Sequence, residues 1–295
     1  MKLSETRLGP ILSAVQARAE KRCAEGNLER LLAQQESPQA QREAVHAQQD
    51  SPQAGEHHAP NSSGREFFCG NLQQKNLAII AEHKRVAPSA GQLAASGAQA
   101  DAQDVEKRCA AYAQGGAAAL SILTEEDFFA GSLDDLRRAQ DCGLPRLRKD
   151  FLLNEWMVRE SAAAGADAIL LLAVCLEGSA LAEMTALAHE LDLAVLCEIH
   201  DQEELEFAVA AKPDCIGVNA RDLRTFEIDL NRTLQLLPEV PSGFLRVAES
   251  GLHEFDHLQA VAAAGADAAL IGTAFMRDPQ CLAQWTTRFS EGEVA

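Results

Sequence analysis

Short apolar runs alternate with amphipathic segments from residue 77 to the end of the chain. The runs predict buried strands at 78–82, 117–123, 145–149, 168–174, 193–199, 215–219, 244–250 and 268–272. Helical spacing of apolar residues predicts helices at 103–114, 133–142, 154–164, 179–191, 201–211, 229–237, 254–264 and 278–288. Because strand and helix alternate throughout, the pattern favours parallel βαβ units.

Two of these crossings nearly repeat each other, AAAGADAILLLA at 162–173 and AAAGADAALIGT at 262–273. Each contains a helix end, a Gly stop and a strand, so the same unit recurs four strands later. Eight such units predict an α/β fold, a closed (β/α)8 TIM barrel. The alternative, an open doubly wound sheet, normally carries a G-x-G-x-x-G loop after its first strand, and this sequence has none there.

The N-terminal part has two segments of different composition. Residues 1–33 predict an N-terminal helical extension, since apolar side chains recur at helical spacing from Leu8 to Leu32. Residues 34–64 are mostly Gln, Ser, Pro, Ala and charged residues, and contain the near-duplicates QQESPQA and QQDSPQA. This low-complexity segment is too polar to bury its share of surface, so we expect a disordered insert. Residues 65–295 would then form the barrel catalytic domain.

Composition narrows the classes of partner. The net charge of −18 repels phosphate backbones, so we expect no nucleic-acid partner, although a small anionic substrate can still bind a locally positive pocket. The eight cysteines form no C-x-x-C pair and show no zinc-ligand spacing, so we expect no metal site. We expect the cysteines to be small buried thiols, in a protein of a reducing compartment, the cytoplasm. The N-terminus has no apolar signal region, and no apolar run is long enough to span a membrane.

Charged residues end several predicted strands, at the edge where barrel enzymes place their active sites. Six polar residues are the last or nearly last in their strands: Glu82, Lys84, Lys149, Glu198, Asn219 and Glu249. Strand alternation points many of them into the barrel mouth, where burying charged side chains costs free energy unless they bind a ligand. The same alternation points His83 and His200 away from the mouth, to the surface or against helices. Asp150 and Asp222 are expected to cap or pair locally.

Two chemistries are open for these groups. A lysine and a glutamate that face each other across an apolar mouth can act as general acid and general base. A lysine at a strand end can instead form a Schiff base, as aldolases do. The motifs ESGL and IGTA place Gly beside a hydroxyl after the last two strands, where barrels of this kind hold phosphate. Arg221 could add charge there, and Phe129 and Phe151 could form an aromatic wall.

Eight motifs follow one another at barrel spacing: IIAEHKRVAPSAG, GGAAALSILTEEDFFAGSLDDL, LRKDFLL, AGADAILLL, LCEIHDQEEL, IGVNARDLRTFEIDL, VAESGL and IGTAFM. Through them the chain resembles the indole-3-glycerol phosphate synthase family of tryptophan biosynthesis, over residues 5–33 and 66–290. That family closes the indole ring of 1-(2-carboxyphenylamino)-1-deoxyribulose 5-phosphate with loss of CO₂ and water. The resemblance implies a carboxy-lyase that uses no cofactor and no metal.

The resemblance also implies roles for individual residues. Lys149 would be the general acid for ring closure, and Lys84 would face the substrate carboxylate. Glu198 would stabilise charge or take a proton, Glu82 is the second carboxylate candidate, and Asn219 would orient the substrate. The substrate-binding residues implied are Pro88, Ser89, Phe129, Phe151, Arg221, Glu249, Ser250, Gly251, Gly272 and Thr273.

The chain departs from the family pattern at a few positions. Ala87 stands where the family usually has Ser, Thr273 and Ala274 replace a Glu-Ser or Ser-Ser pair, and the loop at 91–104 is rich in Ala and Gly. These departures bear on substrate affinity more than on the chemistry.

Two other functions stay open from the residues alone. One is another phosphate-binding barrel enzyme, an isomerase or an aldolase, although the isomerase would need a Cys base where this chain has Glu82 and Lys84. The other is an inactive barrel that acts as a binding partner. On the synthase interpretation, the partner is a small phosphorylated, anthranilate-derived substrate, with no nucleic acid and no membrane. We expect a monomer or weak homo-oligomer, with association with other tryptophan-pathway enzymes left open.

Overall fold

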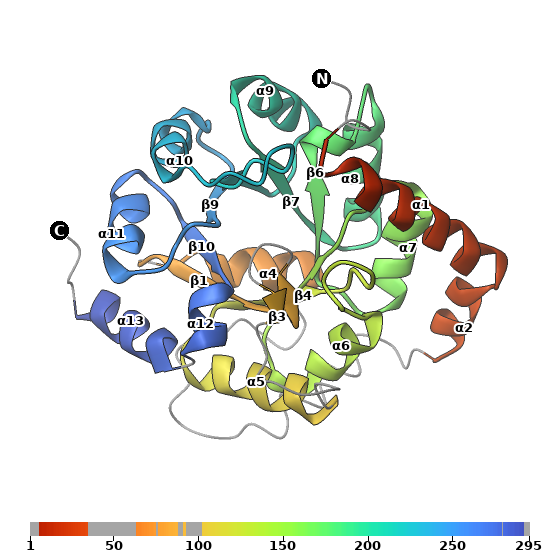
Figure 1. The fold of residues 1–295 in the computed structure, drawn as a ribbon, viewed down its shortest axis with the longest axis horizontal. Coiled ribbons are helices and arrows are strands. Elements are labelled where there is room, and N and C mark those ends of the chain that lie inside the picture. The colour runs from red at the N-terminus through yellow and green to blue at the C-terminus, as the bar shows by residue number, and fades with distance from the viewer. Residues whose placement is uncertain are drawn as a thin grey trace.

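The strands close into a parallel barrel surrounded by helices (Figure 1), in a computed structural model that describes residues 6–34, 63–74, 76–87, 91–92, 102–278 and 280–291. The barrel order is β1-β10-β9-β8-β7-β6-β5-β4. Its strands are β1 (Ala78–His83), β4 (Ala119–Leu123), β5 (Arg146–Lys149), β6 (Ala168–Leu172), β7 (Ala194–Ile199), β8 (Cys215–Asn219), β9 (Leu245–Glu249) and β10 (Ala268–Ile271). The predicted TIM barrel is confirmed, and each predicted strand is present.

Strand β1 closes the ring, because it pairs in parallel with β4 on one side and β10 on the other. Ile80 is opposite Ala119 in the first pair, and Ala78 is opposite Ala268 in the second. Most barrel strands are buried along their whole length, since side chains fill the inside and helices cover the outside. This double burial explains why the strands read as continuous apolar runs. Two further short strands, β2 (Val86–Ala87) and β3 (Gly91–Gln92), pair outside the barrel.

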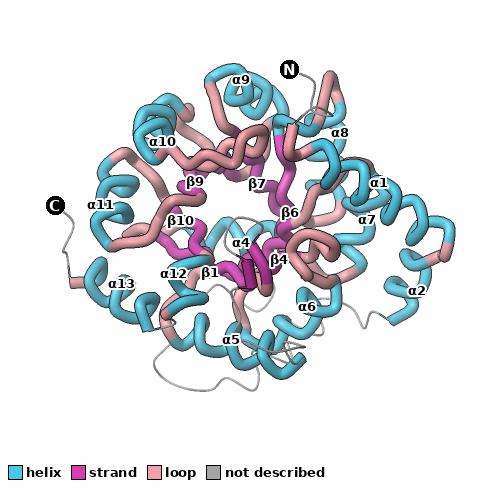
Figure 2. The backbone as a smooth tube through the Cα atoms, in the orientation of Figure 1, coloured by secondary structure: helices cyan, strands magenta, loops and turns pink. Residues whose placement is uncertain are grey.

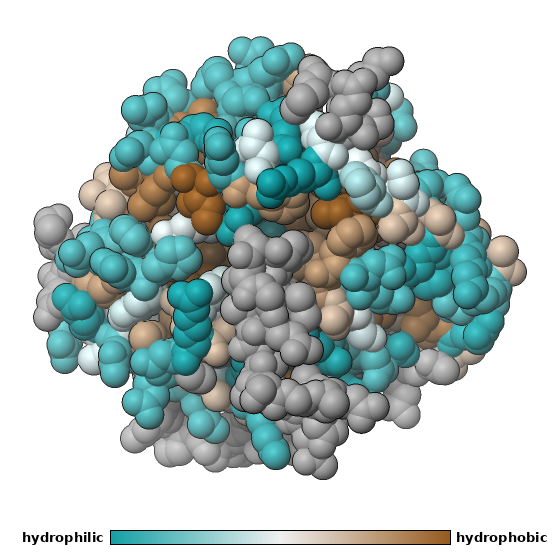
Figure 3. Space-filling model, in the orientation of Figure 1, coloured by the Kyte–Doolittle hydropathy of each residue, from teal (hydrophilic) through white to brown (hydrophobic). Residues whose placement is uncertain are grey.

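Outer helices follow the strands along the chain, and some of them begin at a capping side chain. The outer helices are α5 (Ala102–Gln114), α6 (Leu133–Arg138), α7 (Glu155–Ala163), α8 (Ala180–Glu190), α9 (Gln202–Ala211), α10 (Leu230–Leu236), α11 (Phe255–Ala263) and α13 (Gln280–Ser290). Asn154 Oδ1 accepts from the Met157 amide at 3.1 Å, and Asp201 Oδ1 accepts from the Glu204 amide at 2.9 Å. All eight predicted helices are present. Figure 2 shows them as a cyan ring around the magenta barrel, and Figure 3 shows mostly hydrophilic side chains on the outer helices.

Within the described ranges, two α-helices were not predicted, α4 (Gly64–Leu72) and α12 (Thr273–Arg277). The start of α4 carries a capping box, because Ser63 Oγ accepts from the Glu66 amide and Glu66 Oε2 accepts from the Ser63 amide. Ser63 and Gly64, assigned to the insert from their composition, therefore belong to a helix start. The rest of that segment, apart from residue 34 at the end of α2, lies outside the described residues.

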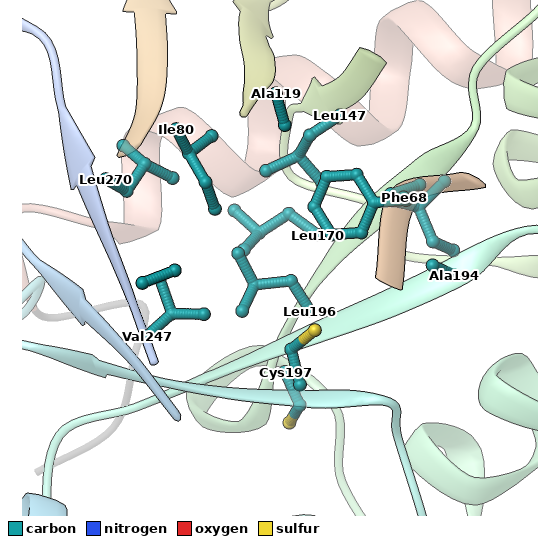
Figure 4. Packing of buried hydrophobic residues seen from close by; sticks show 14 of the residues in the cluster. Phe68, Ile80, Ala119, Leu147, Leu170, Ala194, Leu196, Cys197, Val247 and Leu270 are labelled. Carbon is teal, nitrogen blue, oxygen red and sulfur yellow. The ribbon is translucent and has the colours of Figure 1, made fainter. Parts of the chain in front are cut away.

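Helix α4 closes the N-terminal end of the barrel, where it contacts β1, β4, β6 and β7. Phe68 is fully buried there, and Figure 4 shows its ring beside Leu147 and Leu170. The helix is tied to neighbouring loops through polar groups, since Arg65 Nε lies 2.7 Å from Asp214 Oδ1. With this end filled, the opposite end is the one available for a ligand.

The N-terminal extension is helical, as predicted, and forms α1 (Gly9–Ala24) and α2 (Asn27–Gln34). Its apolar stripe is buried against the barrel, with Ile11 and Val15 each no more than 3% exposed. Two arginines on α1 reach barrel carboxylates: Arg18 Nη2 lies 3.0 Å from Glu125 Oε1, and Arg22 Nε lies 3.0 Å from Glu160 Oε1. The extension therefore packs onto the barrel beside α7 and the loop after β4.

All eight cysteines are unpaired thiols. Cys197 and Cys215 are fully buried within strands, as expected for small apolar residues, whereas Cys175 is half-buried and Cys23 is exposed. Within the described ranges, no helix combines the length and apolar character needed to cross a bilayer.

Replacing Phe68 by Ala should remove about 3–5 kcal/mol of unfolding free energy, because it empties the centre of the contact between α4 and the barrel. Denaturant unfolding measures this loss. The matched control is Phe207→Ala on α9, where the ring is 55% exposed and the change should stay within about 0.5 kcal/mol. Equal effects of the two substitutions would contradict the plugging role of α4.

Candidate active site

A cavity opens at the carboxyl ends of the barrel strands. It is lined by thirteen of the residues predicted from sequence: Glu82, Lys84, Phe129, Lys149, Phe151, Glu198, Asn219, Arg221, Glu249, Ser250, Gly251, Gly272 and Thr273. The two other predicted residues, Pro88 and Ser89, lie outside the described part of the chain. The structure therefore brings together every predicted site residue that it describes, while their catalytic roles remain predictions.

Lys149 is the centre of the polar side of this cavity. Its Nζ lies 3.1 Å from Glu249 Oε2 and 3.3 Å from Glu198 Oε2, so it bridges carboxylates from β9 and β7. Burial alone would lower the pKa of Lys149, but attraction to Glu249 and Glu198 outweighs it and raises that pKa. Lys149 is therefore an ammonium group at neutral pH.

The two carboxylates that share Lys149 differ in their affinity for a proton. Burial raises the pKa of Glu249 to about 7, against the opposing pull of Lys149. Burial also acts on Glu198, but Lys149 and His200 together hold the pKa of that carboxyl well below its usual range. The site thus pairs one permanently ionised carboxylate with one that exchanges a proton near neutral pH, an arrangement typical of acid–base catalysis.

Gly217 makes room for Glu249 inside the barrel. A Cβ at this position on β8 would collide with Glu249 Oε1 and would lie 3.1 Å from Leu196 Cδ1. Only glycine allows the carboxylate to approach the strand this closely.

A second ion pair lies on β1, where Lys84 Nζ is 2.5 Å from Glu82 Oε1. Glu82 is almost fully buried, and Lys84 follows the last residue of the strand. Gly272, at the end of β10, approaches this pair so closely that a Cβ there would collide with Glu82 Oε1. Both lysines of the cavity are thus held by carboxylates and point into the same space.

Another side of the cavity combines backbone turns with a cation. Ser250 and Gly251 both have positive φ, 64° and 74°, which ends β9 in a sharp left-handed turn. A non-glycine residue in this conformation is uncommon, and such residues cluster at functional sites. Arg221 also lines the cavity, and its Nη1 donates to the Phe226 carbonyl at 3.3 Å. Thr273 begins α12 directly after Gly272.

Two aromatic rings form an apolar wall. The rings of Phe129 and Phe151 lie 6.4 Å apart between centroids, at an interplanar angle of 39°. Glu125 holds the loop that carries Phe129, because its carboxylate accepts from the amides of Asp127, Phe128 and Phe129. The wall is thus built from the ends of β4 and β5, as the sequence predicted.

Other lining residues gave no usable signal in the sequence. Leu170 and Leu172 come from β6, which ends without a polar residue, and Leu223 and Phe226 come from the loop after β8. His253 lines the cavity from the loop after β9. Among the described residues, no group of three His, Cys, Asp or Glu side chains could hold a metal ion.

The structure distinguishes between the two positions predicted for His200, at the surface or against a helix. The side chain is not at the surface but 2% exposed, and its Nε2 lies 3.3 Å from Glu198 Oε1. His200 directly follows β7, which ends at Ile199, and its side chain does not line the cavity. Its contact with Glu204 on α9 agrees with the helix-packing alternative. His83 is also buried, at 2% exposure.

The two aspartates expected to cap or pair locally do so. Asp150 Oδ2 accepts from Thr124 Oγ1 at 2.6 Å and from Arg148 Nη2 at 3.0 Å, and Asp222 Oδ1 accepts from the Arg224 amide at 2.7 Å.

A closed (β/α)8 barrel with two lysine–carboxylate clusters at its C-terminal end has the architecture of a barrel enzyme. The family model for indole-3-glycerol phosphate synthase matches residues 28–286. A synthase of that name from Albidiferax ferrireducens is 44% identical over 211 residues, covering 71% of this chain and 78% of the relative. One from Leptothrix cholodnii is 46% identical over 201 residues, covering 68% and 74%. The chain belongs to the indole-3-glycerol phosphate synthase family.

Solved structures of low sequence identity share the fold. The N-acetylmannosamine-6-phosphate 2-epimerase from Clostridium perfringens has a TM-score of 0.56 at 17% identity, covering 82% of this chain and 99% of its own. The thiamine phosphate pyrophosphorylase from Pyrococcus furiosus has a TM-score of 0.53 at 16% identity, covering 76% and 100%. At these identities the likeness concerns the barrel architecture alone.

The raised pKa of Glu249 makes stability depend on pH. Because the folded state holds this proton more tightly than the unfolded chain, the stabilisation is complete below about pH 4.5 and is lost as pH rises through about 7. Relative to Glu249→Gln, the wild-type protein should therefore lose more than about 1 kcal/mol of unfolding free energy between pH 4.5 and 8. Urea unfolding at the two pH values measures it, and parallel pH curves would contradict the raised pKa.

Proposed function

We propose that this protein is a carboxy-lyase that converts 1-(2-carboxyphenylamino)-1-deoxyribulose 5-phosphate to indole-3-glycerol phosphate in tryptophan biosynthesis. The observation that carries the proposal is the position of Lys149 in a chain of this family, bridging Glu198 and Glu249 inside the cavity. The family membership supplies the reaction, and the geometry supplies a proton donor and carboxylates for it.

The reaction needs an acid at two points and a base at one. The ring carbon that bears the carboxylate forms a bond to the ketone carbon, and the ketone oxygen takes a proton. The carboxylate then leaves as CO₂, its bonding electrons restoring the aromatic ring. The new hydroxyl leaves as water after a second protonation, and a base removes a proton from the adjacent methylene carbon. The product retains the glycerol phosphate tail.

Lys149 is the proposed acid for ring closure. It carries a proton at neutral pH because two carboxylates hold its ammonium group. An ammonium group has no lone pair for attack on a carbonyl, so this environment favours acid catalysis over the Schiff-base alternative. General acid help of this kind is typically worth about 10²–10⁴-fold. The rest of the acceleration would come from holding the flexible substrate in a ring-like pose.

The other polar groups complete the proposed machinery. Lys84 would face the substrate carboxylate and assist the dehydration, with Glu82 as its partner 2.5 Å away. Glu198, held ionised, would stabilise positive charge on the ring system or take the methylene proton. Asn219 would orient the substrate, and Glu249 would contact its hydroxyl groups.

The substrate has an aromatic end and a phosphate end, and the cavity offers a surface for each. Phe129 and Phe151 would pack against the anthranilate ring. The polar residues proposed to hold the phosphate are Arg221, Ser250, Gly251, Gly272 and Thr273, all of which line the cavity. Pro88 and Ser89 remain predicted substrate contacts.

The remaining expectations concern the state of the protein in the cell. The protein acts on a small phosphorylated substrate, and we infer that it does so in the cytoplasm, where eight unpaired thiols stay reduced. We infer that the protein is a monomer or a weak homo-oligomer and that it requires no cofactor. Its association with other tryptophan-pathway enzymes stays an open expectation. The division into residues 1–33, 34–64 and 65–295 also stays a proposal, apart from residue 34, which ends α2, and Ser63 and Gly64, which begin α4.

Indole fluorescence should appear when the purified protein meets the carboxyphenylamino-deoxyribulose phosphate. Lys149→Ala should lower kcat by about 10²–10⁴-fold, because the ketone oxygen loses its proton donor. Lys107→Ala is the control, since that lysine is exposed on α5 and should leave kcat unchanged. No fluorescence from well-folded wild-type protein would overturn the proposed function, and full activity in Lys149→Ala would overturn the role of the lysine.

A further inference from the structure

His200 is a buried titratable group next to the site that the proposed mechanism does not use. It follows β7 directly and is 2% exposed, yet it does not line the cavity. Its two ring nitrogens face two carboxylates, with Nδ1 at 2.9 Å from Glu204 Oε2 and Nε2 at 3.3 Å from Glu198 Oε1. Two carboxylates on one buried imidazole require an explanation, because a neutral ring cannot donate a proton to both.

Glu204 determines which nitrogen of His200 carries a hydrogen. Glu204 Oε2 accepts from the His200 backbone amide at 2.8 Å and from Nδ1 at 2.9 Å, while Glu204 Oε1 accepts from Arg224 Nη2 at 2.7 Å. Because the Glu204 carboxylate also accepts from the His200 amide and from Arg224, Oε2 is the acceptor of the contact with the ring and Nδ1 is its donor. The ring is thereby fixed from the side of α9.

The second nitrogen must then be either bare or protonated. A bare Nε2 would turn its lone pair toward the ionised Glu198 Oε1, which is repulsive, whereas a protonated Nε2 places positive charge there. Burial lowers the pKa of His200, but the two glutamates outweigh it and raise that pKa to about 10. The imidazolium is therefore the form that fits the contacts.

The surrounding charges are consistent with this form. Glu198 and Glu204 face the ring from β7 and α9, Arg224 reaches it only through Glu204, and Lys149 lies beyond Glu198. Cys175, in the turn after β6, is a further titratable group near both glutamates, and burial raises its pKa so that it stays neutral. The negative charges of the two carboxylates next to the ring can therefore be balanced in part by a positively charged imidazolium.

We propose that His200 is a positioning residue of the synthase: as an imidazolium clamped by Glu204, it holds Oε1 of Glu198 and leaves Oε2 to Lys149. This inference rests on the proposed function, because it assigns Glu198 a fixed orientation and a permanent charge for the ring-closure reaction. His200 does not touch the substrate cavity, so its contribution should be to kcat rather than to KM.

Two substitutions separate the two nitrogens of the ring. In His200→Asn the amide nitrogen replaces Nδ1, so the contact with Glu204 can persist while the contact with Glu198 is lost. In His200→Gln the amide nitrogen replaces Nε2, so a neutral donor to Glu198 can persist. We expect kcat to fall about 10–100-fold in the Asn variant and less in the Gln variant, with KM changed by less than about threefold in both.

The pH profile of kcat distinguishes positioning from a merely structural role. With His200 present, the pKa of Glu198 lies below the range of the assay. Without the imidazolium, burial raises that pKa, so His200→Asn should gain a new loss of kcat as pH falls from 7 to 5. The matched control is His189→Gln on α8, whose ring pairs with Asp214 at 3.0 Å at the other end of the barrel and should change neither kcat nor its pH profile.

Nitrogen NMR of wild-type protein with labelled histidine tests the charge of His200 separately from enzyme activity. We expect His200, assigned by comparison with His200→Gln, to remain an imidazolium from pH 6 to 9. A neutral ring at pH 8, or a folded His200→Asn variant with wild-type kcat and pH profile, would overturn the proposal. If wild-type protein makes no indole product, the proposed function fails by itself, and the NMR result still decides the charge of His200.

Discussion

The cavity depends on one buried ammonium group held between two carboxylates. Lys149 Nζ bridges Glu198 and Glu249, which are each 1% exposed and would be costly to bury without a cation. The barrel supplies this cation from β5 and the two anions from β7 and β9, so no single βα unit contains the cluster. Because the charges compensate one another, the cluster keeps Lys149 protonated and separates the proton affinities of the two glutamates.

The rest of the molecule keeps the strand ends in place. Helix α4 fills the N-terminal end of the barrel with Phe68, and α1 binds the loop after β4 through Arg18 and Glu125. That loop carries Phe129, so the N-terminal extension and the aromatic wall belong to one connected structure. Stability is thus concentrated at one end of the barrel and chemistry at the other, as is usual for this architecture.

Periodicity predicted the barrel and most of its cavity. Alternate side chains of a strand point to the same face, so the polar residues that end a barrel strand can point into the barrel mouth. It failed where repeats end. Phe226 lies in a loop with a positive φ of 65°, which no pattern of apolar residues indicates. Helix α4 was missed because its capping Ser63 adjoins a polar segment, although the Ser–Glu spacing of a capping box was visible.

A crystal structure with a substrate analogue, in which the ketone is reduced to a hydroxyl, tests the central role of Lys149 most directly. The predicted result is a distance of about 2.7–3.2 Å between Lys149 Nζ and the oxygen that replaces the ketone, with the aromatic ring against Phe151 and the phosphate beside Gly251. An analogue bound with that oxygen on another donor, and Lys149 still bridging Glu198 and Glu249, would contradict the assignment of Lys149 as the acid.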